Sequence, residues 1–366
     1  MKKIEIPKII SSFFKDSPFE IKDISQVKLF PFPIQIIIKF VILNKKKGEA
    51  HTFLVVLPKE ERYIFRFAVD KEHSEKMEKE SKFLKELNLI NKSTVKIPFI
   101  HFTNRTETNG YGEAFGYHQM IEGISGRDQI FEMKEEEWNY FVEDFSSFLY
   151  FLHSLDISQF GFLQVVETIS LEEIIDHIKK IETVVVENLE SSLLKPKLKN
   201  ERKKISKEKV EKIKNFFKNP LKIFKENQTE DSKYLFRKWE KTQKTKVCCH
   251  ADIKSEHIYF TKNKEKEILQ VSGLIDWTDV NISNPIQDFS GILCFVGAEI
   301  TKKIMEKYLE KKNEISFDFQ FLFDSTLLFS KFHSLKNISE KYLGEGCCAE
   351  APLDLLLEQL SNSFSE

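Results

Sequence analysis

The sequence predicts a two-lobed α+β protein, because short strands and one helix fill its first third and helical periodicity dominates the rest. Short runs of β-branched and aromatic residues alternate with polar turns before residue 70. Beyond residue 123, apolar residues recur at helical spacing instead. We therefore expect an N-terminal lobe over residues 1–122, with a small antiparallel sheet and one helix, and a larger, mainly helical C-terminal lobe over residues 123–366.

The sheet of the first lobe is predicted from three strand-like segments, over residues 35–43, 51–57 and 62–68. The last one alternates, so that Tyr63, Phe65 and Phe67 share one face of the strand. Polar turns separate the three segments, and this order favours an antiparallel meander.

The helix of the first lobe is predicted over residues 71–89. Met77, Leu84 and Leu87 form its apolar stripe, and Glu80 lies on the same stripe between them. Burying a carboxylate without a partner is costly. The pattern therefore predicts that Glu80 pairs with a positive side chain.

The second lobe is predicted from helical patterns that differ in strength. An apolar stripe runs through one long segment as Trp138, Phe141, Val142, Phe145, Phe148, Leu149 and Leu152. Helices are expected to resume after about residue 300. Residues 191–246 form an insert with 17 Lys and 2 Arg against 6 Glu and 1 Asp. This insert is either a solvated helical face or a positive wall that would suit an anionic acceptor.

Composition excludes several classes of protein. The net charge of −1 argues against a basic nucleic-acid-binding protein, and 41% hydrophobic residues provide for a sizeable core. Five cysteines without CxxC spacing indicate reduced thiols instead of disulfides or a zinc site. No apolar run is long enough for a membrane helix, so we expect a cytoplasmic protein without a membrane or nucleic-acid partner. The oligomeric state is left open.

The segment over residues 247–260 carries the clearest chemical signal. Residues 258–260 and 269–275 read as a hairpin that closes near residue 265. This hairpin would bring His257 close to Asp276, with Asp252 one short loop away. Phosphoryl transfer needs one carboxylate to orient the acceptor hydroxyl and a second to hold Mg²⁺.

At this point the chain resembles the aminoglycoside/macrolide phosphotransferase family, which has a protein-kinase-like fold. His250-Ala251-Asp252, followed by His257, resembles the catalytic loop of that family. Ile275-Asp276-Trp277 resembles its metal-binding segment, and the segment ending in Asp288 resembles a structural one. The resemblance extends from about residue 35 to residue 295, except that residues 165–245 are unmatched in detail.

The resemblance implies roles for each matching residue in the second lobe. Asp252 would be catalytic. Lys254 departs from the pattern of that family and resembles the lysine that follows the catalytic aspartate by two positions in protein kinases, so it would approach the transferred phosphate. His257 and Asp276 would be metal ligands, although Mg²⁺ prefers oxygen to imidazole nitrogen. His257 could instead stabilise the loop. His153 is expected to be a packed residue at a helix end.

The resemblance also implies a nucleotide site. Arg66 would contact the phosphates and pair with Glu80, although the two could be an ordinary ion pair. The remaining residues expected to contact the nucleotide are Gly48, His51, Gln119 and Ile121. The implied function is transfer of a phosphate from ATP or GTP, with Mg²⁺, to a hydroxyl of a small-molecule acceptor. The alternatives are a pseudokinase that binds nucleotide or a partner, and a protein kinase. The second is disfavoured because Asp276 and Asp288 lie too close in sequence for an activation segment.

Overall fold

The structure, a computed structural model, describes residues 20–21, 37–42, 51–56, 61–104, 114–166, 211, 245–263, 267–312, 319–327 and 329–330. The chain divides into two compact units. Unit 1 comprises Met1–Lys92, Lys96–Glu122 and Gly273–Asp279. Unit 2 comprises Ser93–Val95, Gly123–Ser272 and Val280–Glu366. The predicted assignment of nucleotide binding to residues 1–122 and of catalysis to residues 123–366 stays a prediction.

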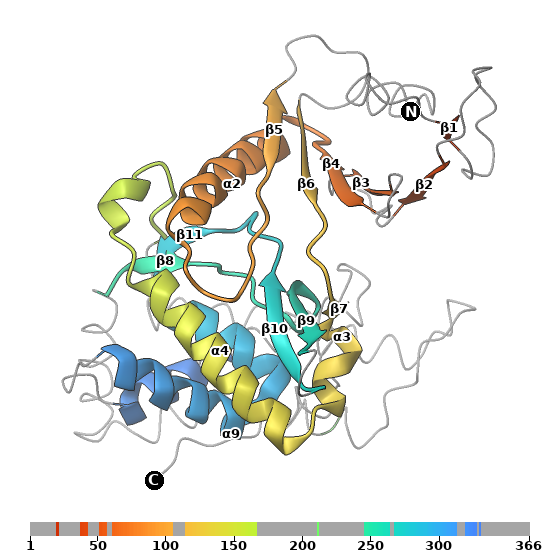
Figure 1. The fold of residues 1–366 in the computed structure, drawn as a ribbon. Helices are drawn as coiled ribbons and strands as arrows, with labels where there is room; N and C mark the ends of the chain where they lie inside the picture. Colours follow the sequence, from red (N-terminus) through yellow and green to blue (C-terminus); the bar gives the residue numbers. More distant parts are fainter. Residues whose placement is uncertain are drawn as a thin grey trace. The chain divides into compact units, whose positions relative to one another are not determined.

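A six-stranded sheet is the main β-element of unit 1 (Figure 1). In spatial order its strands are β1 (Glu20–Ile21), β2 (Ile37–Ile42), β3 (His51–Val56), β4 (Arg62–Phe67), β6 (Ala114–Gln119) and β5 (His101–Asn104). The pair β1–β2 is parallel, and every other neighbouring pair is antiparallel. The predicted meander is confirmed by β2, β3 and β4.

The two faces of β4 have different partners, as its alternating sequence predicts. Phe65 and Phe67 are buried, and their rings stack on those of Tyr117 and Phe115 in β6, with centroid distances of 5.1 and 5.4 Å. Successive side chains of a strand point to opposite faces. Arg66 therefore lies on the other face, where it meets helix α2.

Helix α2 (Lys71–Ile90) follows β4 and carries the predicted apolar stripe. It begins because the side chain of Asp70 accepts a hydrogen bond from the backbone N–H of His73 at 2.9 Å. Its buried residues are Ser74, Met77, Glu80, Phe83, Leu84 and Leu87. Glu80 is only 1% exposed, so the predicted need for a positive partner holds in the structure.

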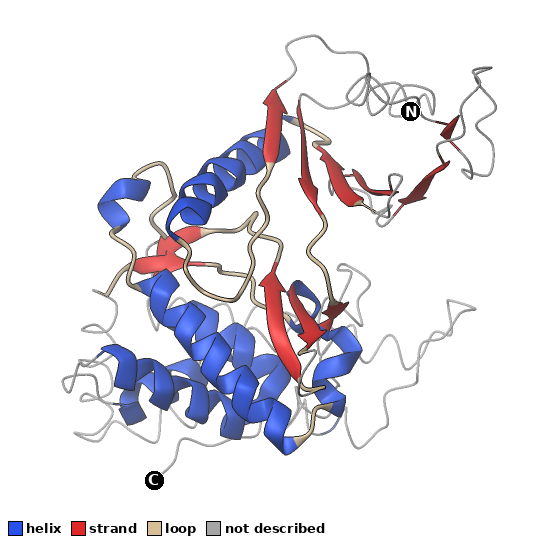
Figure 2. Cartoon of the chain, in the orientation of Figure 1, coloured by secondary structure: helices blue, strands red, loops and turns tan. Residues whose placement is uncertain are grey.

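Unit 2 is built around α4 (Glu135–His153) and α9 (Ile286–Lys312), which pack against each other (Figure 2). Apart from the half-buried Trp138, the predicted stripe of α4 is buried. Short helices α3 (Gly126–Gln129), η2 (Ile130–Glu132) and η3 (Ile157–Phe160) flank α4 in sequence.

The expected return of helix near residue 300 is wrong, because α9 already begins at Ile286. Asn284 caps this helix by accepting a hydrogen bond from the backbone N–H of Ile286 at 3.0 Å. Gly297, with φ 79° and ψ 176°, then interrupts the helix. That conformation is essentially restricted to glycine. The interruption divides the apolar pattern of α9 into two shorter stretches, and the first of these is too short to predict a long helix from periodicity alone.

Two small sheets flank the segment with the chemical signal. One has the order β10 (Leu269–Leu274), β9 (Ile258–Lys262), β7 (Ile124–Ser125), and it confirms the predicted hairpin. The other pairs β8 (Val247–Cys249) with β11 (Asn281–Ser283) in antiparallel fashion.

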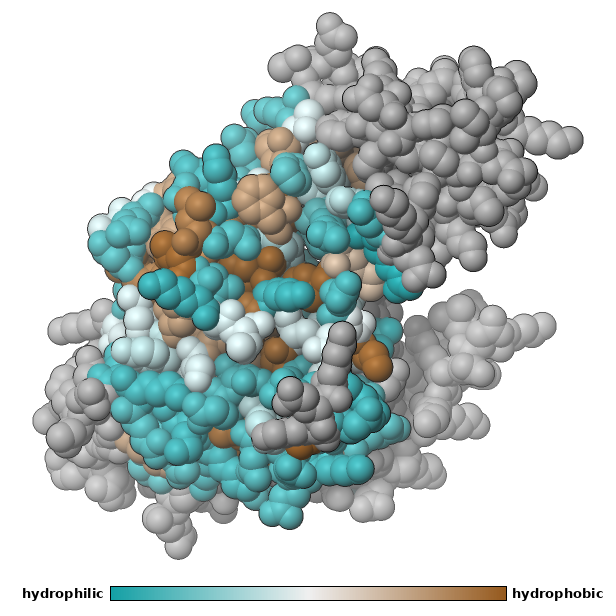
Figure 3. All heavy atoms as spheres, viewed as in Figure 1, coloured by the Kyte–Doolittle hydropathy of each residue, from teal (hydrophilic) through white to brown (hydrophobic). Residues whose placement is uncertain are grey.

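The surface agrees with a core made of these elements. In Figure 3 the described part of unit 2 shows a mostly hydrophilic face, while its apolar stripe residues are buried. Among the described residues, no helix combines the length and the apolar character that crossing a bilayer requires.

Candidate active site

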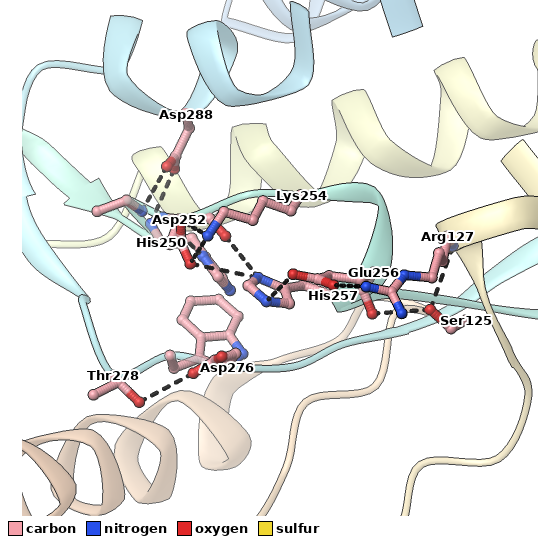
Figure 4. A network of polar contacts seen from close by, with 12 residues as sticks. Ser125, Arg127, His250, Asp252, Lys254, Glu256, His257, Asp276, Thr278 and Asp288 are labelled. Atoms are coloured by element: carbon pink, nitrogen blue, oxygen red, sulfur yellow. Dashed lines mark hydrogen bonds and ion pairs between the residues drawn. The ribbon is translucent and has the colours of Figure 1, made fainter. Parts of the chain in front are cut away.

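The loop that follows β8 is held in place by a buried carboxylate from α9 (Figure 4). Asp288 is 0% exposed and accepts the backbone N–H of His250 at 3.0 Å and that of Ala251 at 2.7 Å. These bonds fix a backbone in which Ala251 has φ 69°, a left-handed conformation that is unfavourable for alanine. Asp288 thus has the scaffold position that the resemblance implies for it.

Asp252 projects from this loop, and its side chain is 26% exposed. Lys254 Nζ lies 2.8 Å from Asp252 Oδ1 and 2.9 Å from Oδ2, so it contacts both carboxylate oxygens. The predicted catalytic pair therefore lies together in unit 2, with a carboxylate that solvent can reach.

His257 also lies at this loop, and a hydrogen bond links its ring to the loop backbone. Its Nδ1 is 2.8 Å from the backbone oxygen of Asp252. A carbonyl oxygen can only accept a hydrogen bond, so Nδ1 carries a proton and donates it to Asp252. His257 therefore stabilises the loop through Nδ1, while its Nε2 lies 3.7 Å from Glu256 Oε1. Its role as a metal ligand stays a prediction.

A second set of contacts, which sequence reasoning missed, fixes the far end of the loop. Arg127 Nη2 donates to Glu256 Oε2 at 3.3 Å, and Ser125 Oγ donates to the backbone oxygen of Glu256 at 3.1 Å. Gly126 is needed between them, because a Cβ there would lie 2.7 Å from the backbone oxygen of Ser255. These partners are about 130 positions apart in sequence, so no local pattern reveals them.

His153, Cys249 and Asp288 form a buried cluster of residue types that can bind metals. Their polar atoms are already occupied by protein partners. His153 contacts Asp288 Oδ2 through Nε2 at 3.1 Å and the Tyr308 hydroxyl through Nδ1 at 3.3 Å. The cluster is therefore a packed hydrogen-bond network, and His153 is the buried helix-end residue that was predicted.

The neighbouring thiols do not resemble nucleophiles. Cys248 and Cys249 are both fully buried in β8. Burial raises the pKa of Cys248 to about 12 and that of Cys249 well above its usual value. Both side chains therefore remain thiols at neutral pH and belong to the core, as predicted.

In unit 1, Arg66 and Glu80 form the predicted ion pair. Arg66 Nη1 lies 2.9 Å from Glu80 Oε1 and 2.8 Å from Oε2. Burial opposes the charge of Arg66, but the carboxylates of Glu80 and Asp276 raise the pKa of the guanidinium above its usual value. Burial also raises the pKa of the Glu80 carboxyl, and Arg66 acts against that rise. These contacts use only some of the five N–H groups of a guanidinium.

Asp276 joins the same network through Thr278, a residue that sequence reasoning did not single out. Arg66 Nη2 donates to Thr278 Oγ1 at 2.6 Å, and Thr278 Oγ1 lies 3.1 Å from Asp276 Oδ1. The backbone N–H of Trp277 reaches Glu80 Oε1 at 3.2 Å. Asp276 itself has φ 65°, the left-handed region. Arg66, Glu80 and Asp276 are thus brought together within unit 1.

The chemistry of Asp276 fits Mg²⁺. A carboxylate supplies the oxygen ligand that this ion prefers, and Thr278 Oγ1 lies 3.1 Å from one of its two oxygens. The imidazole of His257 fits Mg²⁺ less well as a direct ligand, because an imidazole binds metals through nitrogen and Mg²⁺ prefers oxygen.

The structure describes three of the four other residues that are expected to contact a nucleotide. Gln119 ends β6 and is exposed, and its backbone pairs with Tyr63. Ile121 is buried, and a Cβ on Gly273 would lie 2.6 Å from its Cγ2 atom. His51 begins β3, and Gly48 lies outside the described residues, as does nearly all of the Lys-rich insert. Contact of these residues with a nucleotide stays a prediction.

Comparisons with known proteins agree with this fold. A model described as the phosphotransferase enzyme family matches residues 43–319, while no curated protein matches the chain. The GDP complex of wild-type aminoglycoside 2'-phosphotransferase-IIIa has a TM-score of 0.59 at 15% identity, with 99% of each chain covered. The gentamicin complex of APH(2'')-IIa has a TM-score of 0.53 at 17% identity, with 99% of this chain and 95% of that chain covered. The predicted kinase-like α+β fold is confirmed.

Proposed function

The chain belongs to the phosphotransferase enzyme family, and from this premise we propose that it transfers the γ-phosphate of ATP or GTP to a hydroxyl of a small-molecule acceptor. One observation carries the proposal: Asp252 presents a partly exposed carboxylate, with Lys254 on both of its oxygens, from a loop that Asp288 holds rigid. Phosphoryl transfer to a hydroxyl requires a positioned carboxylate and nearby positive charge that stabilises the phosphate, and Asp252 and Lys254 offer both.

Asp252 orients the acceptor hydroxyl and accepts its proton. Lys254 is a compact charge on a flexible stem, and an incoming phosphate competes with Asp252 for it. If the ammonium group of Lys254 moved from Asp252 to the phosphate, the carboxylate of Asp252 could accept a hydrogen bond from the acceptor hydroxyl. His257 supports this step by holding the backbone oxygen of Asp252, which keeps the loop in place.

Asp276 is the proposed ligand of Mg²⁺, with His257 contributing directly or through a water molecule. When bound, the ion supplies neutralisation of phosphate charge. Arg66, held by Glu80, offers its remaining N–H groups to the phosphates. Gly48, His51, Gln119 and Ile121 are the proposed contacts with the rest of the nucleotide.

The acceptor is proposed only as a class. The relatives described above were solved with GDP or gentamicin, and these ligands are properties of those proteins. The Lys-rich insert over residues 191–246 would favour an anionic acceptor if it borders the acceptor site.

The test is γ-phosphate transfer from labelled ATP and GTP to aminoglycosides, macrolides, sugars and amino alcohols, with Asp252→Asn as the key variant. Loss of a general base costs about 10²- to 10⁴-fold in turnover. We expect a loss in this range, with nucleotide affinity kept within a few-fold. Glu299→Gln, an exposed carboxylate of α9, is the matched control. Unchanged turnover in Asp252→Asn would refute the assigned role.

A pseudokinase is the second candidate, favoured by the nitrogen that His257 offers where Mg²⁺ prefers oxygen. This candidate predicts nucleotide binding that depends on Mg²⁺, without transfer to any acceptor. The same screen separates the two functions.

A further inference from the structure

Thr278 lies within hydrogen-bonding distance of three charged side chains in unit 1. Its Oγ1 atom is 2.6 Å from Arg66 Nη2, 3.1 Å from Asp276 Oδ1 and 3.3 Å from Glu80 Oε2. A threonine side chain is small and neutral, so its place among two carboxylates and a guanidinium calls for a physical reason.

The direction of each bond follows from the donors available. A guanidinium only donates, so the hydroxyl oxygen of Thr278 accepts from Arg66. The hydroxyl then has a single proton to give to one of two carboxylates. Glu80 already receives Arg66 Nη1 on both oxygens. It also receives the backbone N–H of Trp277. Asp276 Oδ1 is the nearer of the two acceptors, so the proton of Thr278 goes to Asp276.

We propose that Thr278 is a positioning residue that links Arg66 to Asp276 and fixes the rotation of the Asp276 carboxylate. The inference rests on the proposed function, in which Asp276 holds Mg²⁺. The terminal torsion of an aspartate has a broad, two-fold preference. A hydrogen bond to Oδ1 selects one orientation, and this presents Oδ2 in a constant direction.

The link depends on arginine at position 66. Arg66 uses Nη1 for Glu80 and Nη2 for Thr278, and a lysine has only one nitrogen for both. Replacing Arg66 with lysine keeps the charge but forces a choice between the two partners. The effects of Arg66→Lys and of a Thr278 substitution should therefore be non-additive.

The experiment measures metal binding directly, in the full-length chain. Mn²⁺, a divalent probe for oxygen ligands, is titrated in the presence of ATP, or of GTP if ATP does not bind, and followed by electron paramagnetic resonance. The variants are Thr278→Val, which keeps the shape and removes the hydroxyl, and Thr278→Ser, which keeps the hydroxyl. Asp276→Asn and the double variant Asp276→Asn/Thr278→Val complete a cycle.

We expect Thr278→Val to weaken Mn²⁺ binding by about tenfold to a hundredfold, the range for one hydrogen bond to a charged group. Thr278→Ser should restore binding to within about threefold, because it keeps the same hydroxyl. Nucleotide binding without metal should stay within a few-fold of wild type in both variants, because Arg66 keeps its two contacts with Glu80. In the Asp276→Asn background, Thr278→Val should have no further effect on Mn²⁺ binding.

A purely structural role gives a different pattern. If Thr278→Val lowers the unfolding midpoint and metal-free nucleotide binding while Mn²⁺ affinity is unchanged, or if its effect is equal in the Asp276→Asn background, the inference is wrong. Should Thr278→Val not fold, Thr278→Ala is measured instead, because it leaves room for a water molecule. If Asp276→Asn itself leaves Mn²⁺ binding intact, the proposed function fails and not merely the role of Thr278.

Discussion

Two residues of the candidate site hold a left-handed backbone without being glycine. Ala251 has φ 69° and Asp276 has φ 65°. Such a conformation costs an ordinary residue about 1–2 kcal/mol. At Ala251 the cost is offset by the two backbone N–H groups of the loop that bond to Asp288. Strain of this kind persists only where surrounding contacts determine the conformation, and it is common at functional sites.

The strain at Ala251 can be removed by deleting one methyl group, which packs in a small buried cluster with Val247 and Cys249. We expect Ala251→Gly to raise the unfolding free energy of unit 2 by about 0.5–1 kcal/mol, because relief of strain exceeds the entropy that glycine adds to the unfolded chain. Turnover should stay within a few-fold of wild type. Urea denaturation measures the change, and a loss of stability would show that the Cβ of Ala251 makes a contact worth more than the strain.

His118 predicts a pH dependence of unit 1. It is buried in β6, and its Nδ1 donates to the backbone oxygen of Gln119 at 2.8 Å. Burial lowers the pKa of His118 from 6.5 to about 4. Between these values the unfolded chain binds more protons than the folded one, so the unfolding free energy rises as pH increases from about 4 to about 6.5. The slope contributed by His118 approaches about 1.4 kcal/mol per pH unit.

The variant His118→Gln isolates this contribution, because its amide can donate to the same carbonyl but does not titrate in this range. Urea midpoints of both proteins are compared at intervals between pH 5 and pH 7. As pH rises, the urea midpoint of wild type should increase relative to that of His118→Gln. Parallel curves would mean that His118 is accessible to protons in the folded state.

At the scale of elements, the sequence predicts those helices and strands whose pattern lies within a short stretch of the chain. The periodicity of their own residues predicts helix α2 and strand β4. A carboxylate on an apolar stripe predicts a positively charged partner, which for Glu80 is Arg66. The β9–β10 hairpin was predicted because its strands are close in sequence. These signals are local, so a single sequence carries them.

Other elements depend on contacts that no local pattern records. The pairing of β8 with β11 joins Cys249 to Asn281, and the start of α9 was hidden by the break at Gly297. Thr278 follows the predicted metal segment directly, yet nothing in its neighbours shows that it meets Arg66, which lies 212 positions away. The charged residues Arg66 and Asp276 could be predicted from their residue types, whereas the neutral Thr278 between them could not.

At the scale of the whole molecule, the proposed roles divide between the two units. Arg66, Glu80 and Asp276 belong to unit 1, because the segment Gly273–Asp279 clusters there although it follows β10 in sequence. Asp252 and Lys254 belong to unit 2. The proposal therefore assigns the phosphate contact of Arg66 and the Mg²⁺ ligand Asp276 to unit 1. It assigns proton acceptance by Asp252, and the supporting contacts of Lys254 and His257, to unit 2.

This division predicts that Asp276→Asn and Asp252→Asn differ in how much Mg²⁺ and nucleotide raise the unfolding midpoint. A ligand at 100 times its dissociation constant stabilises the folded chain by about 2.7 kcal/mol, because it binds the folded state alone. Mg²⁺ with ATP or GTP should therefore raise the unfolding midpoint of wild type. Asp276→Asn should lose the part of this rise that requires Mg²⁺, whereas Asp252→Asn should keep the full rise while turnover falls. Differential scanning fluorimetry with nucleotide, with and without chelator, provides the measurement. Equal loss of the rise in both variants would mean that Asp252 is as necessary as Asp276 for binding Mg²⁺ with the nucleotide, and the assignment of Asp252 to proton acceptance alone would have to be abandoned.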